Sequence, residues 1–491
     1  MDTPGRLLSF VRTNDTDGCP QMTFRPHMTV LEQVAALESG EISSFDLVEA
    51  TLDAIEAAEP HIDAYRIIRR EEALKEATAA DERRARGERG SLLGVPVAIK
   101  DETNLAGYPT AFGCRGDWPI ATEDAEMVRR LREAGAVIVG KTNSPELGQW
   151  PFTEGYEFTT RNPWNLAHSP GGSSGGASAT VASGAVAASF GADGAGSVRI
   201  PSSWTNLVGI KPQRGRISTY PVLDPFYGLT VYGPLSRTVA DAAYLLDVTT
   251  GNDPRDVYRP AAPQEPFAAA AARSPKRLRI ALSFKVPFTA IRASVDPRIE
   301  SSTRRLAEVL AGLGHDVIEA DPDYGLLGAS FLPRSMVGLN DWVKGSPDTS
   351  VLDPRTRGNA RTGSFLRGPA LMAARASDGY FERRIGAIFD RVDVVLAPTT
   401  AQPPLPIGSA APGTSNHRTD QTIIGACPMT WPWNVLGWPS VNVPAGFISG
   451  LPVGAQLMGP ACSEALLISL AAELEASEKW FLNTAPALVT A

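Results

Sequence analysis

Two serines and one lysine lie in sequence surroundings that suit acyl transfer. Ser173 lies in the glycine-rich run PGGSSGG at 170–176, Ser197 lies in GADGAGSVRIP at 191–201, and Lys100 ends the apolar run GVPVAIK. Glycines let the backbone approach a substrate closely and turn several N–H groups toward one point, which a developing oxyanion requires. Because burial disfavours the charged form of lysine, its pKa can fall toward neutrality and its amine can act as a base. The three residues indicate acyl transfer without histidine.

These segments resemble those of the amidase signature family, serine hydrolases that cleave C–N bonds through a Ser-Ser-Lys triad. The family separates its bridging serine from its nucleophile by 24 positions, as Ser173 and Ser197 are separated here. The resemblance implies that Ser197 is the nucleophile, that Ser173 is the bridging serine after a cis peptide bond, and that Lys100 is the base. It also implies an oxyanion hole made by the backbone N–H groups of Gly194, Ala195, Gly196 and Ser197.

The resemblance continues over most of the chain. It assigns supporting roles around the triad to Ser174, Asp193 and Arg199. One departure is that Ala192 and Gly194 stand where the family commonly has two threonines, and Ala195 stands where it has glycine. The backbone hole does not depend on the lost hydroxyls, unless the Cβ of Ala195 forbids a positive φ that the hole needs. Other matching segments occur in family order at 141–147, 161–165, 207–212, 233–241, 396–400, 433–434, 444–446 and 450–457.

An amide nitrogen leaves poorly unless it is protonated as the C–N bond breaks. A chain of Lys100, Ser173 and Ser197 could first remove the nucleophile's proton and then return it to the leaving nitrogen. Hydroxyl groups suit this relay because each is a donor and an acceptor. The sequence therefore predicts an acyl-enzyme mechanism.

The elements that must position these residues alternate between helices and apolar strands. This pattern predicts an α/β fold, with a mixed central β-sheet flanked by α-helices on both faces, as the family fold implies. We expect residues 1–27 to be an N-terminal extension and 28–491 one domain, with 262–390 as a variable region that covers the substrate. Thr29 and Ser43 or Ser44 are candidate N-caps. Expected helices lie at 45–55, 70–86, 123–134 and 301–313 and after Ser174, and expected strands at 92–99, 136–139 and 316–319.

Composition excludes several function classes. A formal net charge of −8 argues against a nucleic-acid surface, and we expect a small-molecule substrate and a monomer or homodimer. No signal peptide or membrane-spanning run is evident, which together with four scattered cysteines favours the cytoplasm. The five histidines have no metal-binding spacing, so no metal and no cofactor are expected.

Aromatic residues near the motifs suggest a substrate with apolar or aromatic parts, for which the family resemblance implies apolar amides, arylamides or carbamates (urethanes). The main alternative is an amidotransferase subunit that releases ammonia from glutamine for aminoacyl-tRNA amidation. A phosphate loop at 171–176 is disfavoured because no lysine follows it. A pair of Ser173 with nearby His168 is also disfavoured, because the loop geometry favours His168 as a turn residue or a supporting residue. The candidate pocket residues are Trp150, Phe152, Tyr220, Phe226, Tyr227 and Trp433.

Overall fold

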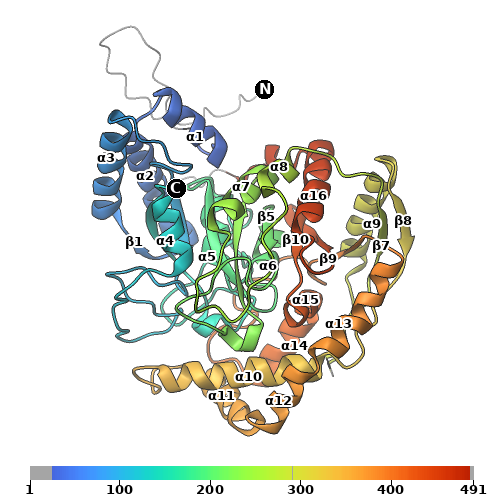
Figure 1. The fold of residues 1–491 in the computed structure, drawn as a ribbon. Helices are drawn as coiled ribbons and strands as arrows, with labels where there is room; N and C mark the ends of the chain where they lie inside the picture. Colours follow the sequence, from blue (N-terminus) through green and yellow to red (C-terminus); the bar gives the residue numbers. More distant parts are fainter. Residues whose placement is uncertain (1–24, 290, 487–491) are drawn as a thin grey trace, which may run out of the picture.

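A mixed sheet of 11 strands forms the centre of the protein (Figure 1). The structure, a computed structural model, describes residues 25–289 and 291–486. The strand order is β1-β3-β2-β4-β6-β5-β10-β11-β9-β7-β8, with parallel pairs at β3-β2-β4 and β9-β7-β8 and antiparallel pairs elsewhere. The strands are β1 (Tyr65–Ile68), β2 (Pro96–Lys100), β3 (Val137–Thr142), β4 (Ala188–Asp193), β5 (Val208–Lys211), β6 (Val231–Ser236), β7 (Arg279–Leu282), β8 (Asp316–Glu319), β9 (Val394–Pro398), β10 (Ser440–Ile448) and β11 (Leu451–Met458).

Helices cover both faces of this sheet, so the predicted fold class is confirmed. Alternation along β2 shows the two faces: Val97 and Ile99 belong to the largest core cluster, whereas Ala98 packs in a second cluster on the other side. The α-helices are α1 (Val30–Ser39), α2 (Ser44–Ile62), α3 (Arg70–Ala85), α4 (Glu126–Glu133), α5 (Gly175–Ala182), α6 (Arg199–Trp204), α7 (Val239–Thr249), α8 (Phe267–Ala271), α9 (Pro297–Gly312), α10 (Gly328–Gly345), α11 (Pro354–Leu366), α12 (Pro369–Ala376), α13 (Asp378–Gly386), α14 (Asn416–Ala426), α15 (Pro432–Leu436) and α16 (Glu464–Glu478). Four short 3-10 helices are η1 (Glu146–Gly148), η2 (Pro225–Gly228), η3 (Ala387–Asp390) and η4 (Trp480–Leu482).

The local signals located these elements, except that the strand expected at 92–99 begins only at Pro96, because residues 91–94 form a turn. Thr29 caps α1, since its hydroxyl accepts the N–H of Glu32 at 3.1 Å, and Ser43 caps α2 by accepting the N–H of Asp46 at 3.0 Å. The small-residue helix begins directly after Ser174, as expected, but ends at Ala182, ahead of β4.

The sheet brings the chemical segments together. Because β2 and β4 are parallel neighbours, their carboxyl ends meet at one edge of the sheet. Lys100 ends β2 and Asp193 ends β4, so the loop that carries Ser197 leaves the sheet beside Lys100. Residues 97 apart in the sequence (100 and 197) thereby belong to one site.

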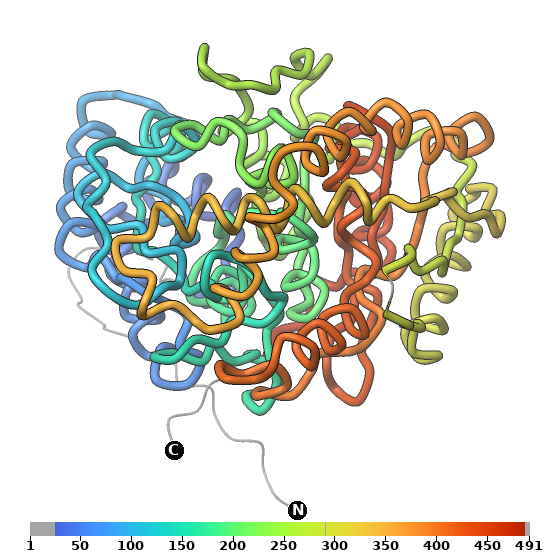
Figure 2. Tube along the Cα trace, turned by 90° about the horizontal axis from the view of Figure 1, so that it is seen from below, coloured from blue at the N-terminus to red at the C-terminus, as the bar shows by residue number. Residues whose placement is uncertain are grey.

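The segment 262–390 contributes to the sheet and also covers it. Strands β7 and β8 extend the sheet at one end. Helices α10, α11 and α12 lie together on one side of the molecule, next to the central part of the sheet (Figures 1 and 2). Helix α10 packs against η2, where a Cβ on Gly338 would lie 2.5 Å from the Phe226 ring. The predicted extension, residues 1–27, lies outside the described residues apart from its last three positions.

No helix within residues 25–289 and 291–486 is long and apolar enough to cross a membrane. Three cysteines of this part of the chain are free thiols, of which Cys114 and Cys427 are buried and Cys462 is exposed.

Candidate active site

Lys100 is completely buried at the end of β2 and points at a serine hydroxyl. Its Nζ lies 2.6 Å from Ser173 Oγ, to which it donates a hydrogen bond, and 2.8 Å from Glu102 Oε1. Burial lowers the pKa of Lys100, and the nearby carboxylate of Glu102 opposes this shift. The lysine is therefore held in place by two polar partners while its charged form is disfavoured by its surroundings.

Ser173 and Ser197 come together through the backbone. The Gly172–Ser173 peptide bond is cis, and the next residue, Ser174, donates its N–H to the carbonyl of Ser197 at 3.2 Å. Both serines are nearly buried, with 2 % and 9 % of their surface exposed. Their hydroxyls share no hydrogen bond in the described structure, and such bonds often tighten only when substrate binds.

Asp193 organises the loop before Ser197. Its carboxylate accepts the N–H of Gly196 at 2.8 Å and of Val198 at 3.2 Å, and it forms a fully buried ion pair with Arg199 at 3.0 Å. Arg199 also donates to the Thr430 carbonyl at 3.0 Å and to side chains on α15 and β11. This network joins the serine loop to the C-terminal strands, which fits the supporting roles expected for Asp193 and Arg199. Ser174 donates its hydroxyl to the Ala192 carbonyl at 3.3 Å.

One of the four N–H groups expected to form the oxyanion hole already donates a hydrogen bond within the protein. Gly196 donates to Asp193, whereas the N–H groups of Gly194, Ala195 and Ser197 have no partner among the described residues. Gly196 has a φ of 121°, and a Cβ there would lie 2.2 Å from Thr430 Oγ1, so this position requires glycine. Ala195 is not among the residues with positive φ, so its side chain does not obstruct this backbone arrangement.

Sequence reasoning missed Glu102, which lines a cavity beside the lysine. The cavity approaches the serine loop through Thr230, whose Oγ1 would lie 2.8 Å from a Cβ on Gly194. Its walls are mainly apolar, and we call it the Glu102 cavity. It is lined by Glu102, Phe112, Leu147, Ala192, Val222, Pro225, Phe226, Thr230, Tyr232 and Trp342.

The six expected pocket residues are dispersed. Phe226 lines the Glu102 cavity, while Phe152 and Trp433 are core residues and the Trp433 indole donates to the Gly459 carbonyl. Tyr227 donates its hydroxyl to Asp341, and Tyr220 stacks with Arg255 at the surface.

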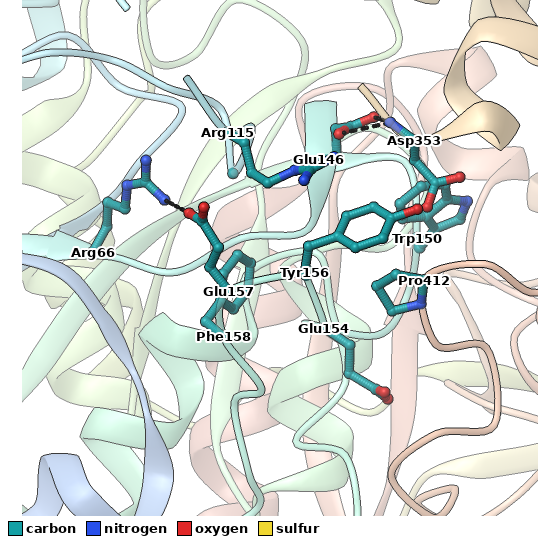
Figure 3. Close-up of a pocket in the computed structure, with 12 residues that line it drawn as sticks. Arg66, Arg115, Glu146, Trp150, Glu154, Tyr156, Glu157, Phe158, Asp353 and Pro412 are labelled. Carbon is teal, nitrogen blue, oxygen red and sulfur yellow. Dashed lines mark hydrogen bonds and ion pairs between the residues drawn. The ribbon is translucent and has the colours of Figure 1, made fainter. Parts of the chain in front are cut away.

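Trp150 lines a separate, charged pocket (Figure 3). There the Arg115 guanidinium lies 4.2 Å from the centre of the Tyr156 ring, and Glu146 accepts the N–H of Asp353. None of the predicted triad residues lines this pocket. The backbone of Trp150 nevertheless packs against the loop that carries Ser173, since a Cβ on Gly172 would lie 2.9 Å from the Trp150 carbonyl oxygen.

A Ser–His pair is not formed. The ring Nδ1 of His168 has no hydrogen-bond partner in the described chain, and the His168 backbone pairs with Pro406. Sequence reasoning also missed that the amine of Lys211 is buried. It donates to the Pro212 carbonyl at 3.0 Å, and burial lowers its pKa well below the usual value. Within the described ranges, no group of three or more potential metal ligands is present.

Comparison with known proteins agrees with this geometry. The Amidase family model matches residues 46–468, and the chain belongs to this family. The protein named "Putative amidase AmiA2" of Mycobacterium tuberculosis is 53% identical over 455 residues, covering 92% of this chain and 93% of the relative. One glutamyl-tRNA(Gln) amidotransferase subunit, from Roseiflexus, is less similar, at 35% identity over 488 residues, with 94% of this chain and 98% of the relative covered.

Two solved structures share the whole fold. One is a 6-aminohexanoate cyclic dimer hydrolase, with a TM-score of 0.87, 31% identity and coverage of 95% of this chain and 100% of the other. The second is a bacterial aryl acylamidase of the amidase signature family, with a TM-score of 0.85, 27% identity and coverage of 95% and 99%. The protein is thus an amidase-family hydrolase acting on C–N bonds.

Proposed function

We propose that this hydrolase cleaves neutral, largely apolar amides, arylamides or carbamates through a Ser197 acyl-enzyme, with Ser173 and Lys100 as its proton relay. The observation that carries the proposal is the 2.6 Å hydrogen bond between Lys100 Nζ and Ser173 Oγ in a buried place that lowers the lysine pKa. A neutral amine there can accept a proton without histidine.

In the first half of the reaction, Ser197 Oγ forms a bond to the substrate carbonyl carbon. Its proton moves to Ser173 Oγ as the Ser173 proton moves to Lys100 Nζ. The unpartnered N–H groups at 194, 195 and 197 are the donors available to the oxyanion. The C–N bond then breaks, and the relay returns the proton to the leaving nitrogen.

In the second half, water attacks the acyl carbon and gives its proton to the same relay. The relay then protonates Ser197 Oγ as the acyl–oxygen bond breaks, which restores the enzyme and releases the acid. A carbamate follows the same steps, because its carbonyl carbon is attacked in the same way and its leaving amine or alkoxide takes the proton.

The apolar walls of the Glu102 cavity support a substrate with an apolar group. The structural neighbours named an aryl acylamidase and a cyclic dimer hydrolase are consistent with a small-molecule amide. We expect no metal or cofactor to take part.

The test is a panel of an anilide, an aliphatic amide, an aryl carbamate and glutamine, each assayed with and without EDTA. The expected result is EDTA-insensitive hydrolysis of apolar substrates that is absent in Ser197→Ala. Hydrolysis of glutamine alone, and only with partner subunits, would instead favour the amidotransferase function. Chelator-sensitive turnover or a preference for anionic substrates would contradict the proposal.

A further inference from the structure

Glu102 gives Lys100 a carboxylate partner in addition to its serine partner. Glu102 follows β2 and turns back toward the lysine, so that its Oε1 lies 2.8 Å from Lys100 Nζ. The Lys100 side chain is fully buried and that of Glu102 is 14% exposed. At this distance and burial the Coulombic attraction between the two groups exceeds that of a surface ion pair, although burial outweighs it in its effect on the Lys100 pKa.

The fold leaves space for this carboxylate. Gly148, at the end of η1, has a φ of 63°, and a Cβ built on it would lie 2.4 Å from Glu102 Oε1. A larger residue at 148 would therefore displace the carboxylate. Gly148 thus lets Glu102 reach Lys100.

The other charged groups around Lys100 have partners of their own. Asp101, on the same turn, is paired with Lys141 at 3.1 Å, and Asp193, from β4, is paired with Arg199 at 3.0 Å. Glu102 opposes the burial effect on the Lys100 pKa more strongly than either of these carboxylates does.

Tyr232 is the ionisable group that faces Glu102 from β6. It is buried and neutral, since burial raises its pKa. Among the described residues, Lys100 therefore forms its ion pair with Glu102.

We propose that Glu102 is a positioning residue of the amidase reaction, which holds Lys100 against Ser173 and stabilises the ammonium form of the lysine. This inference rests on the proposed function of the Ser197, Ser173 and Lys100 relay. When the Ser197 proton has moved through Ser173 to Lys100, the new positive charge lies beside a carboxylate instead of in an apolar site. The same proton later leaves Lys100, through the serine relay, for the substrate nitrogen.

This arrangement has a measurable consequence for pH dependence. The acid limb of the kcat/KM profile reports the free enzyme's essential base, which here is neutral Lys100. Because Glu102 favours the charged lysine, Glu102→Gln should move the acid limb to lower pH, by about one to three units. The plateau rate should fall about tenfold or more, because a weaker base accepts the Ser197 proton less readily.

The experiment measures two pH profiles in wild type, Glu102→Gln, Glu102→Asp and Gly148→Ala. One profile is kcat/KM for the best substrate of the panel, and the other is the rate at which phenylmethylsulfonyl fluoride modifies Ser197, which needs no substrate. Glu157→Gln is the matched control, because it removes one exposed carboxylate that lies 4.0 Å from Arg66. Gly148→Ala should shift the limb in the same direction as Glu102→Gln, and Glu102→Asp should give a smaller shift.

The outcomes separate the two proposals. A shifted acid limb in Glu102→Gln or Gly148→Ala, with wild-type behaviour in Glu157→Gln, supports the role of Glu102. Unshifted limbs in active variants overturn it and leave the proposed function standing. A wild-type protein that cleaves no amide or carbamate and is not modified at Ser197 refutes the proposed function itself. If Glu102→Gln does not fold, as judged by circular dichroism, the Glu102→Asp and Gly148→Ala profiles decide the question in the same way.

Discussion

Asp193 and Arg199 form an ion pair in which both side chains are completely excluded from solvent, at a distance of 3.0 Å. The Asp193 carboxylate also accepts the Gly196 N–H, so the pair fixes the backbone next to Ser197. Removing one member leaves the other as an uncompensated buried charge, which is more costly than loss of a surface pair.

Arg199→Met should therefore lower the free energy of unfolding by about 3–5 kcal/mol. Urea denaturation followed by circular dichroism measures this change. The control is Arg298→Met, which breaks the pair with Asp296 but leaves an exposed site, and it should cost about 1 kcal/mol or less. Equal costs for the two variants would show that the buried pair contributes no more to stability than an exposed pair does.

Ser197→Ala should abolish turnover, because its hydroxyl is the proposed nucleophile. The melting temperature should stay close to that of wild type, because the Ser197 hydroxyl makes no hydrogen bond among the described residues and its removal leaves little empty space. Ser173→Ala should retain a trace of activity, with a loss of about 10²–10⁴-fold, typical of a removed proton-transfer group. Ser203→Ala is a matched control: Ser203 is a fully buried serine whose hydroxyl has no hydrogen-bond partner in the described chain. Steady-state kinetics should show near-normal kcat for this control. Substantial turnover by Ser197→Ala would exclude it as the nucleophile.

Phe226→Ala should weaken the use of bulky substrates. The Phe226 ring lines the Glu102 cavity and packs against α10, so its loss removes apolar contact area worth about 1.5–3 kcal/mol. We expect KM for an anilide to rise by about tenfold or more, with a smaller change for a short aliphatic amide. An equal change for both substrates would place the aryl group outside this cavity.

Glu475 should make stability depend on pH. Burial raises its pKa from 4.5 to about 7, while its carboxylate accepts the N–H of Val239 at the start of α7. Between these two pH values the folded protein holds a proton that the unfolded chain has lost, so stability falls as the pH rises through 7. Glu475→Gln, which keeps a neutral acceptor, should gain about 1–3 kcal/mol over wild type at pH 8 and little at pH 4.5.

Urea denaturation at both pH values checks this prediction, with the exposed Glu308→Gln as control. A constant difference between wild type and Glu475→Gln across this range would mean that the pKa of Glu475 is the same in the folded and the unfolded protein.

The sequence alone predicted the fold class, which the structure confirms, and the residues of the proposed relay, which follow from local patterns together with the family resemblance. Each of these predictions used residues that are close together in the sequence: the apolar run before Lys100, the glycines around Ser173 and Ser197, and the N-caps Thr29 and Ser43. General rules of backbone geometry and burial are enough to interpret such short segments.

Only the tertiary structure decided which distant side chains meet. Glu102 follows Lys100 closely in sequence, but its contact with the lysine depends on the turn after β2 and on the space left by Gly148. The aromatic residues could not be divided between cavity and core, because Phe226 and Trp433 have the same apolar character and differ only in what packs around them. The hydrogen bond from the Gly196 N–H to Asp193 could not be predicted from the sequence either. The position of the Asp193 carboxylate depends on a fold that brings residues of β4, α6 and α15 into one buried network.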